Sequence, residues 1–218
     1  RVAPDGAALP PGLLRSVVCA DSTGALHVHE GTVNGAGSAL EWLRERVAID
    51  VDRALASPAT TAGPPEPPLF VNGVGGLGAP FWQPGFPVEF VGDADGDDAA
   101  RLAAVLESIA FLLQANFDEI GKFVRPARRI RVSGGVSRLD GLCRRLASVS
   151  GLPVHRRDDA EATARGIGYL AAGRPAIWNE GAAEEIFAPV ADEALRRRYA
   201  RWRELMRLYM VRRTRSFI

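Results

Sequence analysis

The sequence predicts an α/β protein, and three features carry that prediction. Strand-like and helix-like patterns alternate along most of the 218 residues. The longest helical pattern covers residues 97–122, where apolar residues recur at helical spacing. Two apolar or alternating stretches near the start, residues 13–20 and 25–30, are separated by the turn-like sequence DSTG, which is typical of a hairpin.

The remaining elements follow from shorter patterns. Apolar or alternating runs predict strands at residues 13–20, 25–30, 69–73, 88–91, 130–132 and 152–155. Apolar residues three and four positions apart predict helices within residues 31–47 and over residues 97–122, 139–150, 160–172 and 191–215. We expect the first strand to be buried and Asp97 or Asp98 to cap the longest helix. The Pro-rich stretch at residues 60–68 is either a linker or a surface loop.

The composition is that of an ordinary globular protein. Hydrophobic residues make up 47% and charged residues 24%, and the net charge of +1 gives no general argument for nucleic acid or membrane as a partner. No apolar run is long enough to cross a bilayer, and no secretory signal is visible. Cys19 and Cys143 lie in apolar patterns, which favours buried free thiols in a reducing, cytoplasmic compartment.

Two features have both a functional and a structural interpretation. His27 and His29 share one face of an expected strand, but no third metal ligand is evident, so we expect both to face solvent. The expected helix at 191–215 is amphipathic, with arginines beside an apolar stripe. It is either a basic surface for nucleic acid or a helix docked by its stripe, and we favour docking. The stripe consists of Leu195, Tyr199, Trp202, Met206 and Tyr209.

The pair Gly134 and Gly135 follows the strand expected at 130–132 and precedes a helix. Glycine adopts backbone angles that other residues avoid, and it lets a ligand approach the main chain closely. A strand, a glycine turn and a helix N-terminus together form a suitable phosphate site. A tight structural turn uses the same residues, so this pair alone leaves both interpretations open.

Four stretches stand in this order along the chain: EGTVNGAGSALEWL, GVGGLGAPFWQP, RVSGGVSRLDGL and ATARGIGYLAAG. Together they resemble the FGGY family of carbohydrate kinases, and the spacing between them also fits. The second is similar to the SGLGAPYWDP loop of glycerol kinases, the subfamily to which the resemblance is strongest. The third and fourth resemble the family's RVDGGA turn and TALGAAYLAG helix.

The resemblance implies a fold and a reaction. The fold would be an actin-like (ribonuclease H-like) ATPase lobe, with a mixed sheet flanked by helices. Residues 1–218 would form the C-terminal, nucleotide-side lobe of an ATP- and Mg²⁺-dependent kinase for a sugar or polyol, with glycerol favoured. The N-terminal lobe, which carries the Asp general base and most substrate contacts in the family, is expected to be absent. We therefore expect no catalysis by this chain alone and no catalytic or metal-binding residue within it. ATP or ADP is the expected partner, and oligomeric state stays open.

The resemblance also implies nucleotide contacts on residues that this sequence shares with the family. Gly134 and Gly135 would turn the chain at the phosphates, with the Gly135 N–H directed at an oxygen of the α-phosphate. Gly37 matches a family glycine that passes close to the nucleotide. Ser137 lies in the same turn.

Three positions depart from the family pattern. Glu41 stands where glycerol kinases carry Gln, and it still offers acceptors to a ribose hydroxyl. Leu139 occupies the place of an Asn that contacts adenine, so base recognition would be apolar, shifted to Ser137 or Arg138, or lost. Ser133 replaces an Asp before the glycines. These departures motivate the alternative of a degenerate, non-catalytic binding or regulatory module.

The glycine-rich loop at residues 73–85 also has two interpretations. In the family it lies near the face between the lobes. Its glycines would serve either lobe closure or a compact turn, and the sequence does not separate these.

Overall fold

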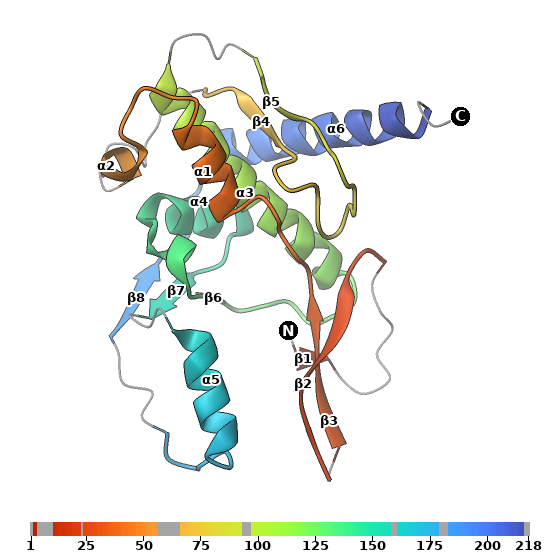
Figure 1. Cartoon of the computed structure of the whole chain (residues 1–218), viewed down its shortest axis with the longest axis vertical. Coiled ribbons are helices and arrows are strands. Elements are labelled where there is room, and N and C mark those ends of the chain that lie inside the picture. Colours follow the sequence, from red (N-terminus) through yellow and green to blue (C-terminus); the bar gives the residue numbers. More distant parts are fainter. Residues whose placement is uncertain are drawn as a thin grey trace.

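The computed structural model describes residues 2–3, 11–22, 24–55, 66–92, 97–157, 161–178 and 183–215. The chain has a mixed α/β fold, as predicted, and Figure 1 shows its elements. The strands are divided among three small sheets. Most of the Pro-rich connector at residues 60–68 lies outside the described residues.

The first sheet is antiparallel, with the order β1 (Val2–Ala3), β3 (Gly24–Glu30), β2 (Leu14–Asp21). The predicted hairpin of β2 and β3 is therefore confirmed, although Thr23 in its turn lies outside the described residues. The prediction that the first strand is buried is wrong. Val17 is 56% and Val18 49% exposed, because β2 lies at the edge of this sheet.

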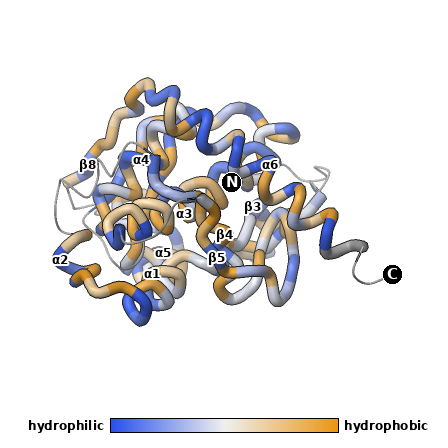
Figure 2. Tube along the Cα trace, turned by 90° about the horizontal axis from the view of Figure 1, so that it is seen from above, coloured by the Kyte–Doolittle hydropathy of each residue, from blue (hydrophilic) through white to orange (hydrophobic). Residues whose placement is uncertain are grey.

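The core surrounds α3 (Asp98–Gly121). Asp97 caps it as expected, since its carboxylate accepts the N–H groups of Ala99 and Ala100 at 3.0 and 3.1 Å. The sequence predicts one apolar face on this helix, but the helix is buried on all sides in its middle part. Every residue from Leu102 to Leu112 is buried. Seen from above, α3 lies near the centre of the molecule (Figure 2).

By length and composition α3 would suffice to cross a membrane, contrary to the expectation that no such run exists. However, 78% of the relevant window is buried inside the protein, as in the core helix of many globular proteins.

Other elements pack on α3. They include α1 (Gly37–Arg44) and β4 (Leu69–Asn72). The strand β5 (Val88–Val91) pairs antiparallel with β4. The short helix α2 (Val51–Leu55), which the sequence patterns do not predict, follows α1. Trp42 of α1 lies 5.3 Å from Phe70 of β4, measured between ring centroids, so aromatic contacts join these elements.

The third sheet has the order β6 (Ile130–Val132), β7 (Val154–Arg157), β8 (Glu184–Phe187). β6 and β7 are parallel, whereas β8 pairs antiparallel with β7. The short 3-10 helix η2 (Gly135–Arg138) and the helix α4 (Asp140–Ser150) connect β6 to β7. β7 starts two residues after its predicted beginning, and the sequence patterns do not predict β8.

The helix α6 (Glu193–Arg215) docks by its apolar stripe. Leu195, Trp202 and Met206 are buried, and the Trp202 ring centroid lies 5.7 Å from that of Phe111 in α3. One arginine of this helix, Arg198, is buried as well, although the pattern indicated solvated arginines.

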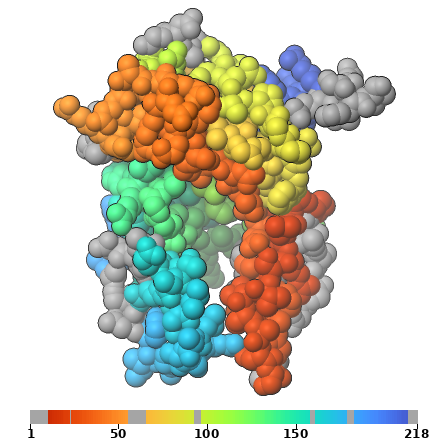
Figure 3. Space-filling model, viewed as in Figure 1, coloured from red at the N-terminus to blue at the C-terminus, as the bar shows by residue number. Residues whose placement is uncertain are grey.

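The helix α5 (Ala162–Ala171) stands apart from this body. We expected its small residues to let another element pack closely, but none of its residues is buried, and Ile167 is 63% exposed. The space-filling view shows an opening between α5 and the first sheet (Figure 3). Arg174, which follows α5, forms an ion pair with Asp21 at the tip of the hairpin. Nη2 of Arg174 lies 2.7 Å from Oδ2 of Asp21.

Candidate functional site

The turn after β6 has the geometry expected of a glycine pair. Gly134 has a φ of +85°, which side-chain-bearing residues rarely adopt. A Cβ atom added at Gly134 or at Gly135 would meet no atom within 4 Å. The glycines are therefore not required by close packing of the protein itself, and the main chain there faces open space.

Ser137 closes this turn from within. Its hydroxyl donates a hydrogen bond to the Gly134 carbonyl at 2.6 Å, and its N–H approaches the same oxygen at 3.2 Å. The hydroxyl proton of Ser137 is thus used to fix the turn, and its role in this structure is to hold Gly134 and Gly135 in place.

The start of α1 lies against the same turn. A Cβ atom added at Gly37 would stand 3.7 Å from Cγ2 of Val136, so the fold brings together residues that are far apart in the sequence. Ala36 is the N-cap of α1 and no side chain caps the helix, which leaves backbone N–H groups free to bind an anion. Gly37, Gly134 and Gly135 form one candidate site.

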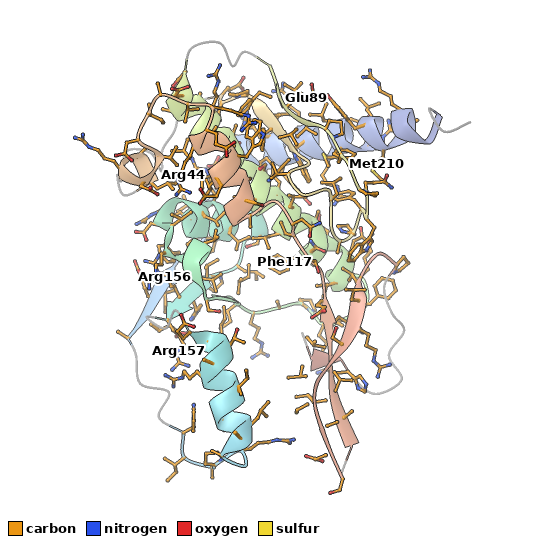
Figure 4. All side chains as sticks on the ribbon, in the orientation of Figure 1. Arg44, Glu89, Phe117, Arg156, Arg157 and Met210 are labelled. Atoms are coloured by element: carbon orange, nitrogen blue, oxygen red, sulfur yellow. The ribbon has the colours of Figure 1, made fainter. Side chains whose placement is uncertain are left out.

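Glu41 and Leu139 take different places. The Glu41 side chain is 71% exposed and forms an ion pair with Arg44, which is labelled on α1 in Figure 4. Leu139 is half-buried, packs against the core and occupies the N-cap position of α4. It offers no hydrogen-bonding group, so this position cannot pair with the polar edge of a base.

Arg156 of β7 holds the turn from outside, and the sequence patterns did not single it out (Figure 4). Its Nη1 donates to the Ser137 carbonyl at 2.9 Å, and its Nη2 donates to the Asp140 carboxylate at 2.7 Å. Glu185 of β8 forms a second ion pair with the same guanidinium. Burial lowers the pKa of Arg156, but the hydrogen bonds to Glu185 and Asp140 outweigh this and raise it overall. Arg156 therefore stays charged and fastens η2 to α4 and β8.

Cys143 lies beneath the turn as a buried thiol. Its Sγ is 3.3 Å from the Ser137 carbonyl, and burial raises the pKa of the thiol to about 11. The thiol is protonated at neutral pH and is unsuited to nucleophilic chemistry. Cys143 is a free cysteine, as is the half-buried Cys19, which was expected to be buried.

The loop at residues 73–85 supports the segment that leads into α1. A Cβ atom at Gly78 would stand 2.1 Å from the Thr32 carbonyl oxygen, closer than real contacts allow. Asn34 donates to the Gly75 carbonyl at 3.3 Å, which adds a second link. These contacts favour the compact-turn interpretation, because Gly78 is required for the two segments to fit together.

The histidine pair gains no support as a metal site. His29 is 1% exposed, so the expectation that it faces solvent is wrong, and His27 is half-buried. Within the described parts of the chain, no three His, Cys, Asp or Glu side chains are grouped as metal ligands.

Comparison with known proteins identifies the family. The sequence profile of the C-terminal domain of the FGGY family of carbohydrate kinases matches residues 14–173. This chain belongs to the FGGY family. Its sequence is 32% identical over 191 residues to the glycerol kinase of Allorhizobium ampelinum and 34% identical over 211 residues to that of Bordetella parapertussis. These alignments cover 82% and 88% of this FGGY chain, but only 38% and 40% of the two relatives.

A solved structure supports the same assignment at the level of the fold. The crystal structure of Plasmodium falciparum glycerol kinase with ADP matches 91% of this FGGY chain and 42% of that protein, with a TM-score of 0.73 and 20% identity. The expected actin-like ATPase fold is thus confirmed. The chain spans about two fifths of the length of the curated relatives it matches.

Proposed function

We propose that this chain is the ATP-binding lobe of a carbohydrate kinase, which transfers the γ-phosphoryl group of ATP to a hydroxyl of a sugar or polyol. The convergence of Gly37 with the Gly134–Gly135 turn carries this proposal, because it joins an uncapped helix N-terminus to a glycine turn facing open space. Membership in the FGGY family supplies the reaction class.

The main chain does most of the proposed binding. The N–H groups of Gly135 and of the first turn of α1 donate to phosphate oxygens, where a side chain would obstruct the approach. Arg156 and Ser137 keep the turn in place. Mg²⁺ is expected to arrive with the nucleotide as the Mg–ATP substrate, where it neutralises phosphate charge. The base that accepts the proton of the substrate hydroxyl is expected outside this chain.

Glycerol is the first candidate substrate. The relatives at 32–34% identity carry the name glycerol kinase. The polyol would be bound mainly by a part of the protein that this chain does not include, so this chain offers no contact that selects glycerol over a pentulose or gluconate. We propose the cytoplasm as the site of this reaction.

A non-catalytic, kinase-like module is the second candidate, and the position of Leu139 favours it. This side chain packs against the core cluster that contains Leu142, and it has no group with which to recognise adenine. In an active kinase the adenine ring of ATP would contact an apolar surface at this position.

A coupled assay of ADP release on the complete protein separates the two candidates. The assay is run with glycerol and, in parallel, with pentoses, pentuloses and gluconate. Turnover with one of them establishes the kinase and names its substrate. No turnover with any of them, for a folded protein that binds ADP, would instead support the non-catalytic module.

A further inference from the structure

Asn72 is the last residue of β4, and it lies where three parts of the core meet. Its side chain is 1% exposed. Its Nδ2 donates two hydrogen bonds, to the Gly35 carbonyl at 2.7 Å and to the Ser108 hydroxyl of α3 at 3.1 Å. The Ser108 hydroxyl donates in turn to the Val105 carbonyl at 2.7 Å, within its own helix. One amide group therefore ties the segment before α1 to the central helix.

The contact between Asn72 and Gly35 is also steric. A Cβ atom added at Gly35 would stand 2.2 Å from Oδ1 of Asn72 and 2.8 Å from its Cγ. The amide thus lies directly on the Gly35 main chain, and a side chain at position 35 would have to displace it. Gly35 does not have a positive φ, so this closeness, and not backbone strain, favours glycine at this position.

Gly35 is two residues before Gly37, which faces Val136 in the glycine turn. A displacement of Gly35 would be carried along the chain to the start of α1. We propose that Asn72 is a positioning residue of the nucleotide site, which fixes residues 35–37 against α3 and thereby sets the place of Gly37 relative to Gly134 and Gly135. This inference rests on the proposed function.

The test combines the variants Gly35→Ala and Asn72→Ala in the complete protein. ADP affinity is measured by calorimetry, and amide hydrogen exchange of residues 31–41 is followed without nucleotide. Gly35→Ala places a methyl group against the amide, and we expect ADP to bind roughly tenfold more weakly and exchange to speed up. Asn72→Ala leaves the Gly35 carbonyl without its donor, and we expect ADP affinity to fall by a similar factor.

The double variant provides the sharpest outcome. Asn72→Ala removes the atoms that the new methyl group meets, so the double variant is expected to bind ADP no more weakly than Asn72→Ala alone. If the double variant instead lost ADP affinity by the product of the two single-variant factors, the proposed contact between Gly35 and Asn72 would be overturned.

Asn116→Ala is the matched control. Asn116 is also a buried asparagine that bonds carbonyl groups, those of Ala79 and Leu112 at 3.0 Å each, but it contacts Gly31 at the far end of the segment. We expect this variant to lower thermal stability while ADP affinity stays within about twofold of the original. If it weakened ADP binding as much as Asn72→Ala does, the effect would be general destabilisation and not positioning.

The controls also separate this inference from the proposed function. A natural protein that binds no ADP would overturn the proposed function, and the positioning role with it. A natural protein that binds ADP, with unchanged affinity in both Gly35→Ala and Asn72→Ala, would overturn the positioning role alone. Should Gly35→Ala fail to fold, Ser108→Ala is the substitute: it removes the acceptor for Asn72 on α3, together with the Ser108 hydrogen bond to the Val105 carbonyl. We expect it to weaken ADP binding by about threefold. Unchanged binding in Ser108→Ala would contradict the proposal.

Discussion

The carboxylate of Glu107 in α3 and the guanidinium of Arg198 in α6 form a buried ion pair. Nε and Nη2 of Arg198 donate to the same oxygen of Glu107, at 2.8 and 2.6 Å, and Nη2 also donates to the Pro68 carbonyl at 3.1 Å. The side chains are only 9% and 7% exposed. This arrangement fastens the last helix to the centre of the core and to the chain entering β4.

Removal of one partner is expected to destabilise the fold strongly. Arg198→Met leaves the Glu107 carboxylate buried without its cation, which should lower the free energy of unfolding by about 3–5 kcal/mol. The double variant Arg198→Met/Glu107→Leu removes both charges and should recover most of that loss. Urea unfolding followed by circular dichroism measures both effects, and an Arg198→Met protein of undiminished stability would show that the pair is unimportant.

The pair also predicts a dependence of stability on pH. Burial raises the pKa of Glu107 from its ordinary value of 4.5, and the opposing effect of Arg198 is smaller. An acid whose pKa is higher in the folded state contributes stability that is complete below 4.5 and is lost as pH rises through the folded pKa. The difference in unfolding free energy between the natural protein and Glu107→Gln should therefore fall as pH rises above 4.5. A difference that is constant from about pH 4 to 7 would contradict this.

Arg156 is expected to matter for the shape of the glycine turn. Arg156→Ala removes the donors to Ser137 and Asp140, so ADP should bind roughly 5- to 20-fold more weakly. Arg156→Lys should recover only part of this affinity, because an ammonium group lacks the planar pair of donors. Arg144→Ala is the control, since Arg144 also faces Asp140 and Phe187 but is exposed. Calorimetry should find near-normal ADP affinity in Arg144→Ala. Equal losses in both alanine variants would contradict a specific role for Arg156.

The apolar surfaces on β2 and α5 predict self-association of the isolated chain. Val17, Val18 and Ile167 are about half exposed or more, and solvent-exposed apolar clusters favour contacts between molecules. The double variant Val17→Thr/Ile167→Glu should therefore lower the average mass measured by light scattering after gel filtration. Thr163→Glu, an exposed change on the same helix as Ile167, should leave the mass unchanged. If the natural chain is monomeric at about 100 μM, this prediction is wrong.

Periodicity in the sequence was sufficient to place most helices, the hairpin and the cap at Asp97. These features depend on neighbouring residues, which the sequence displays directly. Burial was harder to predict, because it depends on which elements meet in space. β2 looks apolar enough for a core but lies at a sheet edge, whereas His29 is polar and buried.

The candidate site was only partly accessible from the sequence. Its glycines could be found, because the family motifs contain them. The residues that contact the neighbours of those glycines were missed, since Asn72 and Arg156 act through partners 37 and 19 positions away. No local pattern distinguishes an arginine that clamps a turn from one that is solvated.

The central claim is that a nucleotide binds where Gly37 meets the turn of Gly134 and Gly135. The most direct test is calorimetry of ADP binding to the complete protein and to its Gly135→Leu variant. Gly135 has open space around it and no positive φ, so a leucine should leave the stability nearly unchanged while it obstructs the phosphates. The account predicts that ADP binds to the natural protein and that Gly135→Leu abolishes binding without unfolding. Binding of ADP with equal affinity to both proteins would contradict the account.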